Sequence, residues 1–121
     1  MSTLNPRQMF LLDNACAPML EPDGVMGVYL VGTAMEPRGD RAPRDIDVRM
    51  ILTDKMYDRL LKALGSEGIA FMGLAYGQYL ASLTQLPIDF QVQRMTEANS
   101  LHPHPRNPLG HRNMRSYRGD T

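Results

Sequence analysis

Residues 45–50 alternate strictly between polar and hydrophobic side chains, and this pattern limits what the chain can fold into. The odd-numbered residues are Asp45, Asp47 and Arg49, and every even-numbered one is hydrophobic. A period of two is typical of a β-strand with one buried face and one wet or functional face. The segment 88–93 alternates in the same way and carries Asp89 on its polar side. We therefore expect two strands that each present carboxylates on one face.

Helical and strand patterns surround these two segments. Asn5-Pro6 is typical of a helix start, which predicts a helix over 6–16. The apolar run 25–31 is typical of a strand covered on both faces. A helix is expected from Thr53 or Asp54 to Gly65, and a second one over about 66–84. The order of elements favours an α/β (α+β) fold with a small mixed sheet flanked by helices.

The length and charge of the chain set further limits. A chain of 121 residues is one domain long, and we divide it into a folded domain over 1–94 and a basic extension over 95–121. The extension is rich in Pro, His and Arg, and we expect its residues 101–121 either to pack over the binding cleft of the protein or to contact a partner chain. Thirteen basic residues balance thirteen acidic ones, which argues against a general nucleic-acid-coating role.

The cysteine content and the hydropathy indicate where the protein works. Cys16 is the single cysteine, so an internal disulfide is excluded and a reducing cytoplasm is expected. The longest wholly apolar runs are a few residues, far short of the roughly 20 that span a bilayer, so no membrane association is expected. Cys16 falls on the apolar side of the first helix, which favours an inert buried thiol.

The carboxylates suggest a metal site. Asp45 and Asp47 lie about 7 Å apart along one strand face, and Asp89 lies on the polar face of another strand. If the strands are neighbours, the three carboxylates converge and need a cation, for which Mg²⁺ or Mn²⁺ is the best match. Two metal ions ~3.5–4 Å apart assist in-line phosphoryl displacement. The alternative interpretation is a solvated polar face.

A phosphate site is suggested by the loop that follows the first strand. Gly32 allows backbone N–H groups to approach a phosphate, and the hydroxyl of Thr33 adds a donor. Four arginines in this loop and on the following strand are further candidates for phosphate binding, because the guanidinium group binds oxyanions in a bidentate manner: Arg38, Arg41, Arg44 and Arg49. Solvent exposure alone is the alternative for each of the loop arginines, and Arg49 is also placed to offset the carboxylate charge.

These motifs resemble a known signature. Val31-Gly32-Thr33, eleven further residues and then Asp45-Ile46-Asp47-Val48 resemble the polymerase-β-type nucleotidyltransferase superfamily. Ile88-Asp89-Phe90 is similar to its third carboxylate motif, and the likeness is to the minimal nucleotidyltransferases of phages and bacteria. Thr33 departs from the family pattern, which has Ser or Gly there. The resemblance implies metal binding by Asp45, Asp47 and Asp89, with Asp89 also helping to deprotonate an acceptor hydroxyl, and β- and γ-phosphate binding by Gly32 and Thr33.

The implied activity is the transfer of a nucleoside monophosphate from a nucleoside triphosphate to a hydroxyl, with release of pyrophosphate. The acceptor stays open among a protein, a nucleic-acid end and a small molecule, and a protein partner or a self-dimer is expected to complete the site. The main alternative is an antitoxin-like or regulatory binding protein of the same fold without catalysis.

Overall fold

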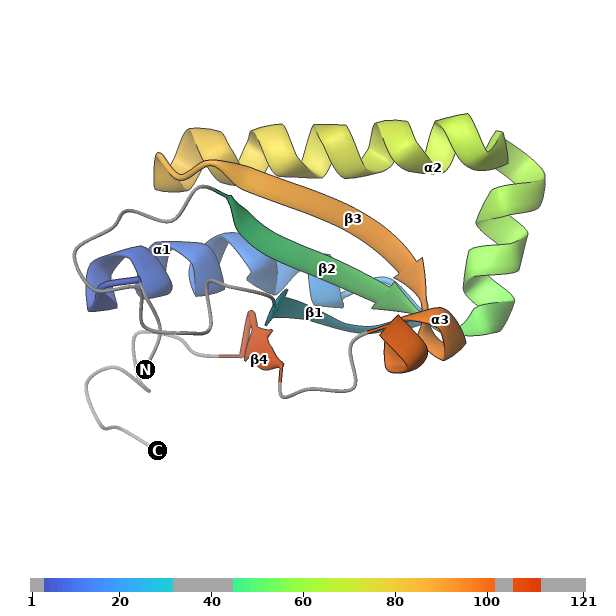
Figure 1. Cartoon of the computed structure of the whole chain (residues 1–121), viewed down its shortest axis with the longest axis horizontal. Helices are drawn as coiled ribbons and strands as arrows, with labels where there is room; N and C mark the ends of the chain where they lie inside the picture. Colours follow the sequence, from blue (N-terminus) through green and yellow to red (C-terminus); the bar gives the residue numbers. More distant parts are fainter. Residues whose placement is uncertain (1–3, 32–44, 102–105, 112–121) are drawn as a thin grey trace.

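The computed structural model describes residues 4–31, 45–101 and 106–111, which form an α+β fold, a small mixed sheet flanked by helices (Figure 1). The elements in chain order are α1 (Pro6–Cys16), the short 3-10 helix η1 (Ala17–Leu20), β1 (Val25–Val31), β2 (Ile46–Leu52), α2 (Asp54–Thr84), β3 (Ile88–Arg94), α3 (Met95–Leu101) and β4 (Asn107–Leu109). The strand order is β3-β2-β1-β4. β2 runs parallel to β3 and antiparallel to β1, and β4 runs antiparallel to β1.

The first helix begins where the sequence predicts it. The side chain of Asn5 accepts a hydrogen bond from the backbone N–H of Gln8, and the Gln8 side chain accepts one from the backbone of Asn5. This reciprocal pair satisfies two N–H groups that a helix start leaves without partners, and Pro6 occupies the first turn. The helix then buries Leu12 and Cys16 against the sheet.

The long helix α2 changes direction at Gly65. The backbone there has φ 74° and ψ 170°, which no residue inside a helix adopts, so two helical segments meet at this point. The sequence predicts a helix end at Gly65, and the structure confirms this, although the second segment starts without a gap. The second segment runs along β3, as the upper part of Figure 1 shows.

One face of the sheet forms the hydrophobic core. The buried side chains of Val48, Met50 and Phe90 belong to one hydrophobic cluster with residues of α1 and of the second segment of α2. α2 approaches β3 closely because Gly73 faces it: a Cβ built there would lie 2.8 Å from the carbonyl oxygen of Phe90. The packing of this face fixes the register between β2 and β3.

The segment after β3 is more regular than the sequence indicates. Residues 95–101 form α3, and residues 107–109 pair with β1 as the fourth strand. Leu109 is fully buried, and the backbone N–H of Gly110 donates to the carboxylate of Asp13 on α1, at 3.1 Å. The described part of the 95–121 segment therefore contributes to the sheet and the core. The strand β4 has three residues, and so short a strand has no periodicity from which it could be predicted.

None of the helices in the described ranges is long and apolar enough to cross a bilayer.

Candidate functional site

Asp47 and Asp89 lie opposite each other on the neighbouring parallel strands β2 and β3. Their side chains belong to the sheet face that points away from the core, because residues on each side of them in sequence are packed inward. Both carboxylates stay partly open, with 26% of the Asp47 side chain and 44% of the Asp89 side chain exposed. Asp45 is exposed and directly precedes β2. The structure thus brings two of the predicted carboxylates together and leaves the third at the entrance to the strand.

Arg49 contacts both carboxylates and is more deeply buried than either of them. Its Nη1 donates to the backbone carbonyls of Val48, at 3.0 Å, and Asp89, at 2.8 Å. Its Nη2 lies 3.4 Å from Oδ2 of Asp89 and 3.7 Å from Oδ1 of Asp47. Only 9% of the Arg49 side chain is exposed. Of the two roles the sequence leaves open for Arg49, these contacts support the offsetting of carboxylate charge.

The protonation of Asp47 reflects this crowding. Partial burial raises the pKa of its carboxyl group, the Arg49 guanidinium acts in the opposite direction, and the negative charge of Asp89 raises it again. A hydrogen bond between the carboxyl groups of Asp47 and Asp89 and the charge of Asp45 raise the pKa further. The pair therefore favours a bound positive charge, either a proton or a cation.

The donor set suits one magnesium ion. Within the described residues, no three His, Cys, Asp or Glu side chains are grouped so that they could hold a metal ion. Mg²⁺, however, is usually bound by one or two carboxylates together with water and substrate phosphates. Asp47 and Asp89 offer such a pair of hard oxygen ligands, and the side chain of each is partly exposed to solvent.

Two buried polar atoms on the same sheet face have no hydrogen-bond partner within the described part of the chain. They are Nε of Arg49 and Oε1 of Gln93, and each residue is only 7% exposed. The alternation of 88–93 marks Gln93 as polar, but nothing in the sequence indicates that a glutamine there is buried. Unpartnered polar atoms in such a position are uncommon and often mark functional sites.

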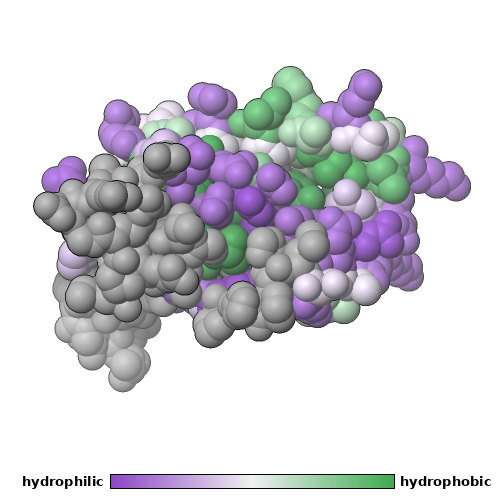
Figure 2. All heavy atoms as spheres, viewed as in Figure 1, coloured by the Kyte–Doolittle hydropathy of each residue, from purple (hydrophilic) through white to green (hydrophobic). Residues whose placement is uncertain are grey.

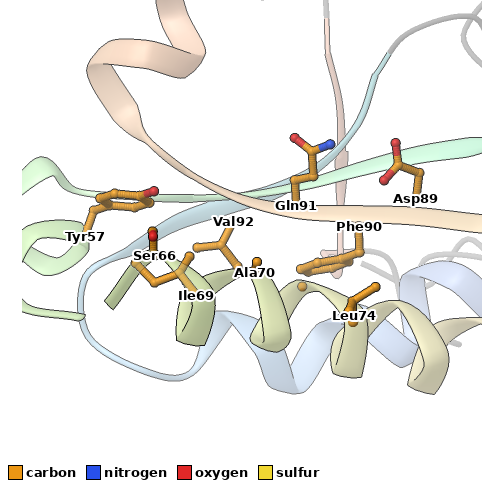
Figure 3. A pocket seen from close by; sticks show the side chains of 10 residues that line it. Tyr57, Ser66, Ile69, Ala70, Leu74, Asp89, Phe90, Gln91 and Val92 are labelled. Atoms are coloured by element: carbon orange, nitrogen blue, oxygen red, sulfur yellow. The ribbon is translucent and has the colours of Figure 1, made fainter. Parts of the chain in front are cut away.

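A groove runs along the edge strand β3 beside this site. It has a volume of about 450 Å³ and lies between β3 and α2. Figure 3 shows Phe90 and Leu74 in the groove, while Asp89 and Gln91 project from the other side of the strand. Asp89 is the only charged residue among those that line the groove in the described structure. The sequence does not indicate this groove, because the patterns of β3 and α2, which form its walls, predict ordinary packing against the core.

The remaining candidates belong to the segment between β1 and β2. Gly32, Thr33, Arg38, Arg41 and Arg44 lie outside the described residues. The last described residue before them is Val31, which pairs with Asp47 across β1 and β2. The chain that carries the predicted phosphate-binding loop therefore leaves the sheet directly beside the carboxylate pair.

Comparison of the chain with protein-family models, with curated proteins and with solved structures finds no match.

Proposed function

We propose that the protein is a metal-dependent nucleotidyltransferase that transfers a nucleoside monophosphate from a nucleoside triphosphate to an acceptor hydroxyl. One observation carries the proposal: Asp47 and Asp89 lie in register on neighbouring strands, with open oxygens, next to the end of β1. The sequence resemblance to the polymerase-β-type nucleotidyltransferases, with Gly32-Thr33 following β1, supports the same reaction.

The chemistry assigns a role to each residue. The acceptor oxygen attacks the α-phosphorus and forms a new P–O bond, while the bond to the oxygen that bridges the α- and β-phosphorus atoms breaks and pyrophosphate leaves. Asp89, the more exposed of the pair, accepts the hydroxyl proton. Asp47 and Asp89 would hold a Mg²⁺ or Mn²⁺ ion, with Asp45 as the third predicted carboxylate, and this ion would neutralise charge on the phosphates. Gly32, Thr33, Arg38 and Arg44 bind the triphosphate, and Arg49 balances the carboxylates from behind.

The cellular setting follows from this reaction. We place the protein in the cytoplasm, where nucleoside triphosphates and magnesium are available and where a free thiol such as that of Cys16 stays reduced. The acceptor remains a protein, a nucleic-acid end or a small molecule.

The test combines binding and turnover. Melting curves of the full chain with Mg²⁺ and each of the four nucleoside triphosphates should show a metal-dependent rise in Tm with at least one of them. Pyrophosphate release from that nucleotide should then be measurable with candidate acceptors. Asp89→Asn should abolish pyrophosphate release, because it removes a metal ligand and the proton acceptor together.

Asp23→Asn is the matched control. Asp23 is an exposed aspartate in the turn before β1, and its replacement makes the same chemical change away from the site. Both the nucleotide-induced rise in Tm and the pyrophosphate release should match those of the unmodified protein. An unchanged Tm with all four nucleotides, or equal effects of Asp23→Asn and Asp89→Asn, would refute the proposal.

A second candidate function is a binding protein of the same fold without catalysis, such as an antitoxin. The observation that favours it is an uncharged stretch of chain, 68–88, most of which forms the second segment of α2. Phe71 and Leu74 on that segment are 70% and 68% exposed, and Figure 2 shows hydrophobic residues gathered over α2. Sedimentation of the full chain with and without Phe71→Ser tests whether this surface joins two copies. Association through Phe71 without any nucleotide-dependent rise in Tm would favour this candidate.

A further inference from the structure

We infer that Arg49 takes the electrostatic place of a second divalent cation, so that the site binds a single Mg²⁺ or Mn²⁺ ion and binds it well only together with a triphosphate. This inference rests on the proposed function, and it concerns how many ions the site takes and when. In it Arg49 is a positioning residue, because it acts through the two carboxylates.

The guanidinium of Arg49 is held by the backbone. Its Nη1 bonds to one carbonyl on β2 and one on β3, and both bonds are independent of the carboxylates. A metal ion that engages Asp47 and Asp89 therefore leaves these anchors in place. An arginine keeps its charge at any pH at which proteins fold. The positive charge behind the carboxylates is thus permanent.

The position of the guanidinium leaves the solvent side of the carboxylates open. Nη2 contacts one oxygen of each carboxylate, Oδ2 of Asp89 and Oδ1 of Asp47. The Arg49 side chain is nine-tenths buried, whereas both aspartate side chains are partly exposed. Both carboxylates thus keep surface that a cation from solvent can reach, while the guanidinium itself is shielded from solvent. In addition, Nε of Arg49 is buried without a partner among the described residues, so the guanidinium has an unused donor inside the site.

The charges then limit metal binding. Two carboxylates and one guanidinium leave one net negative charge at the pair, and exposed Asp45 adds a second nearby. One divalent cation neutralises this set. Two such ions would leave an excess of positive charge unless a polyanion arrived with them, and a triphosphate is such a polyanion. Without nucleotide, a first ion finds only two protein carboxylates, whose charge Arg49 already offsets in part, and water for its other ligands. The nucleotide-free site therefore binds a divalent ion weakly, and the phosphates of a triphosphate supply the missing ligands.

The experiment counts Mn²⁺ ions by electron paramagnetic resonance with the full chain. Without nucleotide, we expect no binding tighter than the millimolar range. With the non-hydrolysable α,β-methylene analogue of the nucleotide that raises Tm, we expect one Mn²⁺ per chain. Two Mn²⁺ ions per chain in that complex would overturn the inference while leaving the proposed function intact.

Three variants test the role of Arg49. Arg49→Gln removes the charge, so Mn²⁺ alone should bind at least about tenfold more tightly than to the unmodified protein. Arg49→Lys keeps the charge and should retain weak binding of Mn²⁺ alone, which a purely structural role would not predict. Arg94→Gln is the matched control, since Arg94 pairs with Asp58 at the far end of β3. It should change neither the affinity for Mn²⁺ alone nor the number of Mn²⁺ ions bound together with the nucleotide analogue.

The outcomes separate the two proposals. If Arg49→Gln folds and binds Mn²⁺ no more tightly than the unmodified protein, the inference is wrong, whether or not nucleotide binds. If Arg49→Gln does not fold, the inference is still tested by the number of Mn²⁺ ions in the unmodified protein and by the affinity of Arg49→Lys for Mn²⁺ alone. If no nucleotide binds at all, the proposed function fails, and the nucleotide-free comparison still tests Arg49.

Discussion

The two faces of β2 and β3 differ in how well their groups are matched. On the core face, Val48, Met50 and Phe90 are buried in hydrophobic contact with the helices. On the opposite face, Asp47 and Asp89 crowd together, and Arg49 keeps a buried nitrogen without a partner in the described structure. The packed face stabilises the fold and fixes the strand register, and this allows the polar face to hold an arrangement that is unfavourable by itself. Functional sites often contain locally unfavourable interactions that the rest of the fold offsets.

The packed side should show the largest loss of stability. Leu109→Ala removes a fully buried side chain from β4, and we expect unfolding to become easier by ~2–5 kcal/mol, because the transfer free energy is lost and a cavity remains. Chemical denaturation followed by circular dichroism measures this change. Leu64→Ala makes the same truncation at a side chain that is 48% exposed, and its effect should stay within about 0.5 kcal/mol. Equal effects of the two variants would show that β4 is not part of the core.

The contact between α2 and β3 provides a second, smaller test. Gly73→Ala places a Cβ against the carbonyl oxygen of Phe90, so we expect a loss of ~1–3 kcal/mol. Gly77→Ala is the control one turn later, where the nearest atom lies at 3.4 Å, an ordinary contact distance. This variant should be neutral or stabilised by up to ~1 kcal/mol through helix propensity. Denaturation midpoints that rank the two variants the other way round would contradict the close packing.

The sequence predicts the scaffold more fully than it predicts the site. Helix capping places α1, a continuous apolar run places β1, and alternation places β2 and β3 close to their observed positions, because these signals are local. The bond from Gly110 to Asp13 joins residues 97 positions apart, and β4 pairs with the distant strand β1; no local sequence pattern indicates such contacts. Alternation also places Asp47 and Asp89 on polar faces, but it cannot show that their strands are neighbours in this register. The burial of Arg49 is equally invisible, since a polar residue on an alternating strand is normally solvated.

The burial of Cys16 in the core makes the stability of the protein depend on pH. Burial, with a smaller contribution from the charge of Asp13, raises the pKa of this thiol to about 12 from a usual value of 9.0. The unfolded chain therefore loses the proton first, and stability falls as the pH rises above about 9. By pH 10 the free energy of unfolding is lower by about 1 kcal/mol. Denaturation at pH 8 and pH 10 should show this loss in the unmodified protein and not in Cys16→Ala. Parallel losses in both proteins would mean that Cys16 does not contribute.

The polar face should respond in the opposite direction, with the smallest effect. Asp47→Asn removes one of two crowded carboxylates and keeps a side chain of similar size. It relieves repulsion from Asp89 and gives up an attraction to Arg49, whose guanidinium stays bound to Asp89 and to two backbone carbonyls. At an effective dielectric near 20 these opposing terms are of similar size, and solvent screens both. We therefore expect the metal-free protein to be unchanged or stabilised by up to ~1 kcal/mol.

Denaturation without metal or nucleotide measures this effect, and Asp23→Asn is again the control for the loss of one negative charge. A loss above ~1 kcal/mol for Asp47→Asn would mean that the Asp47 carboxylate and Arg49 form a structural ion pair. In that case the polar face would stabilise the fold as the packed face does, and the contrast between the two faces would not hold. An unchanged or raised stability would instead show that the carboxylate is not required for folding, because the neighbouring groups keep their contacts without it.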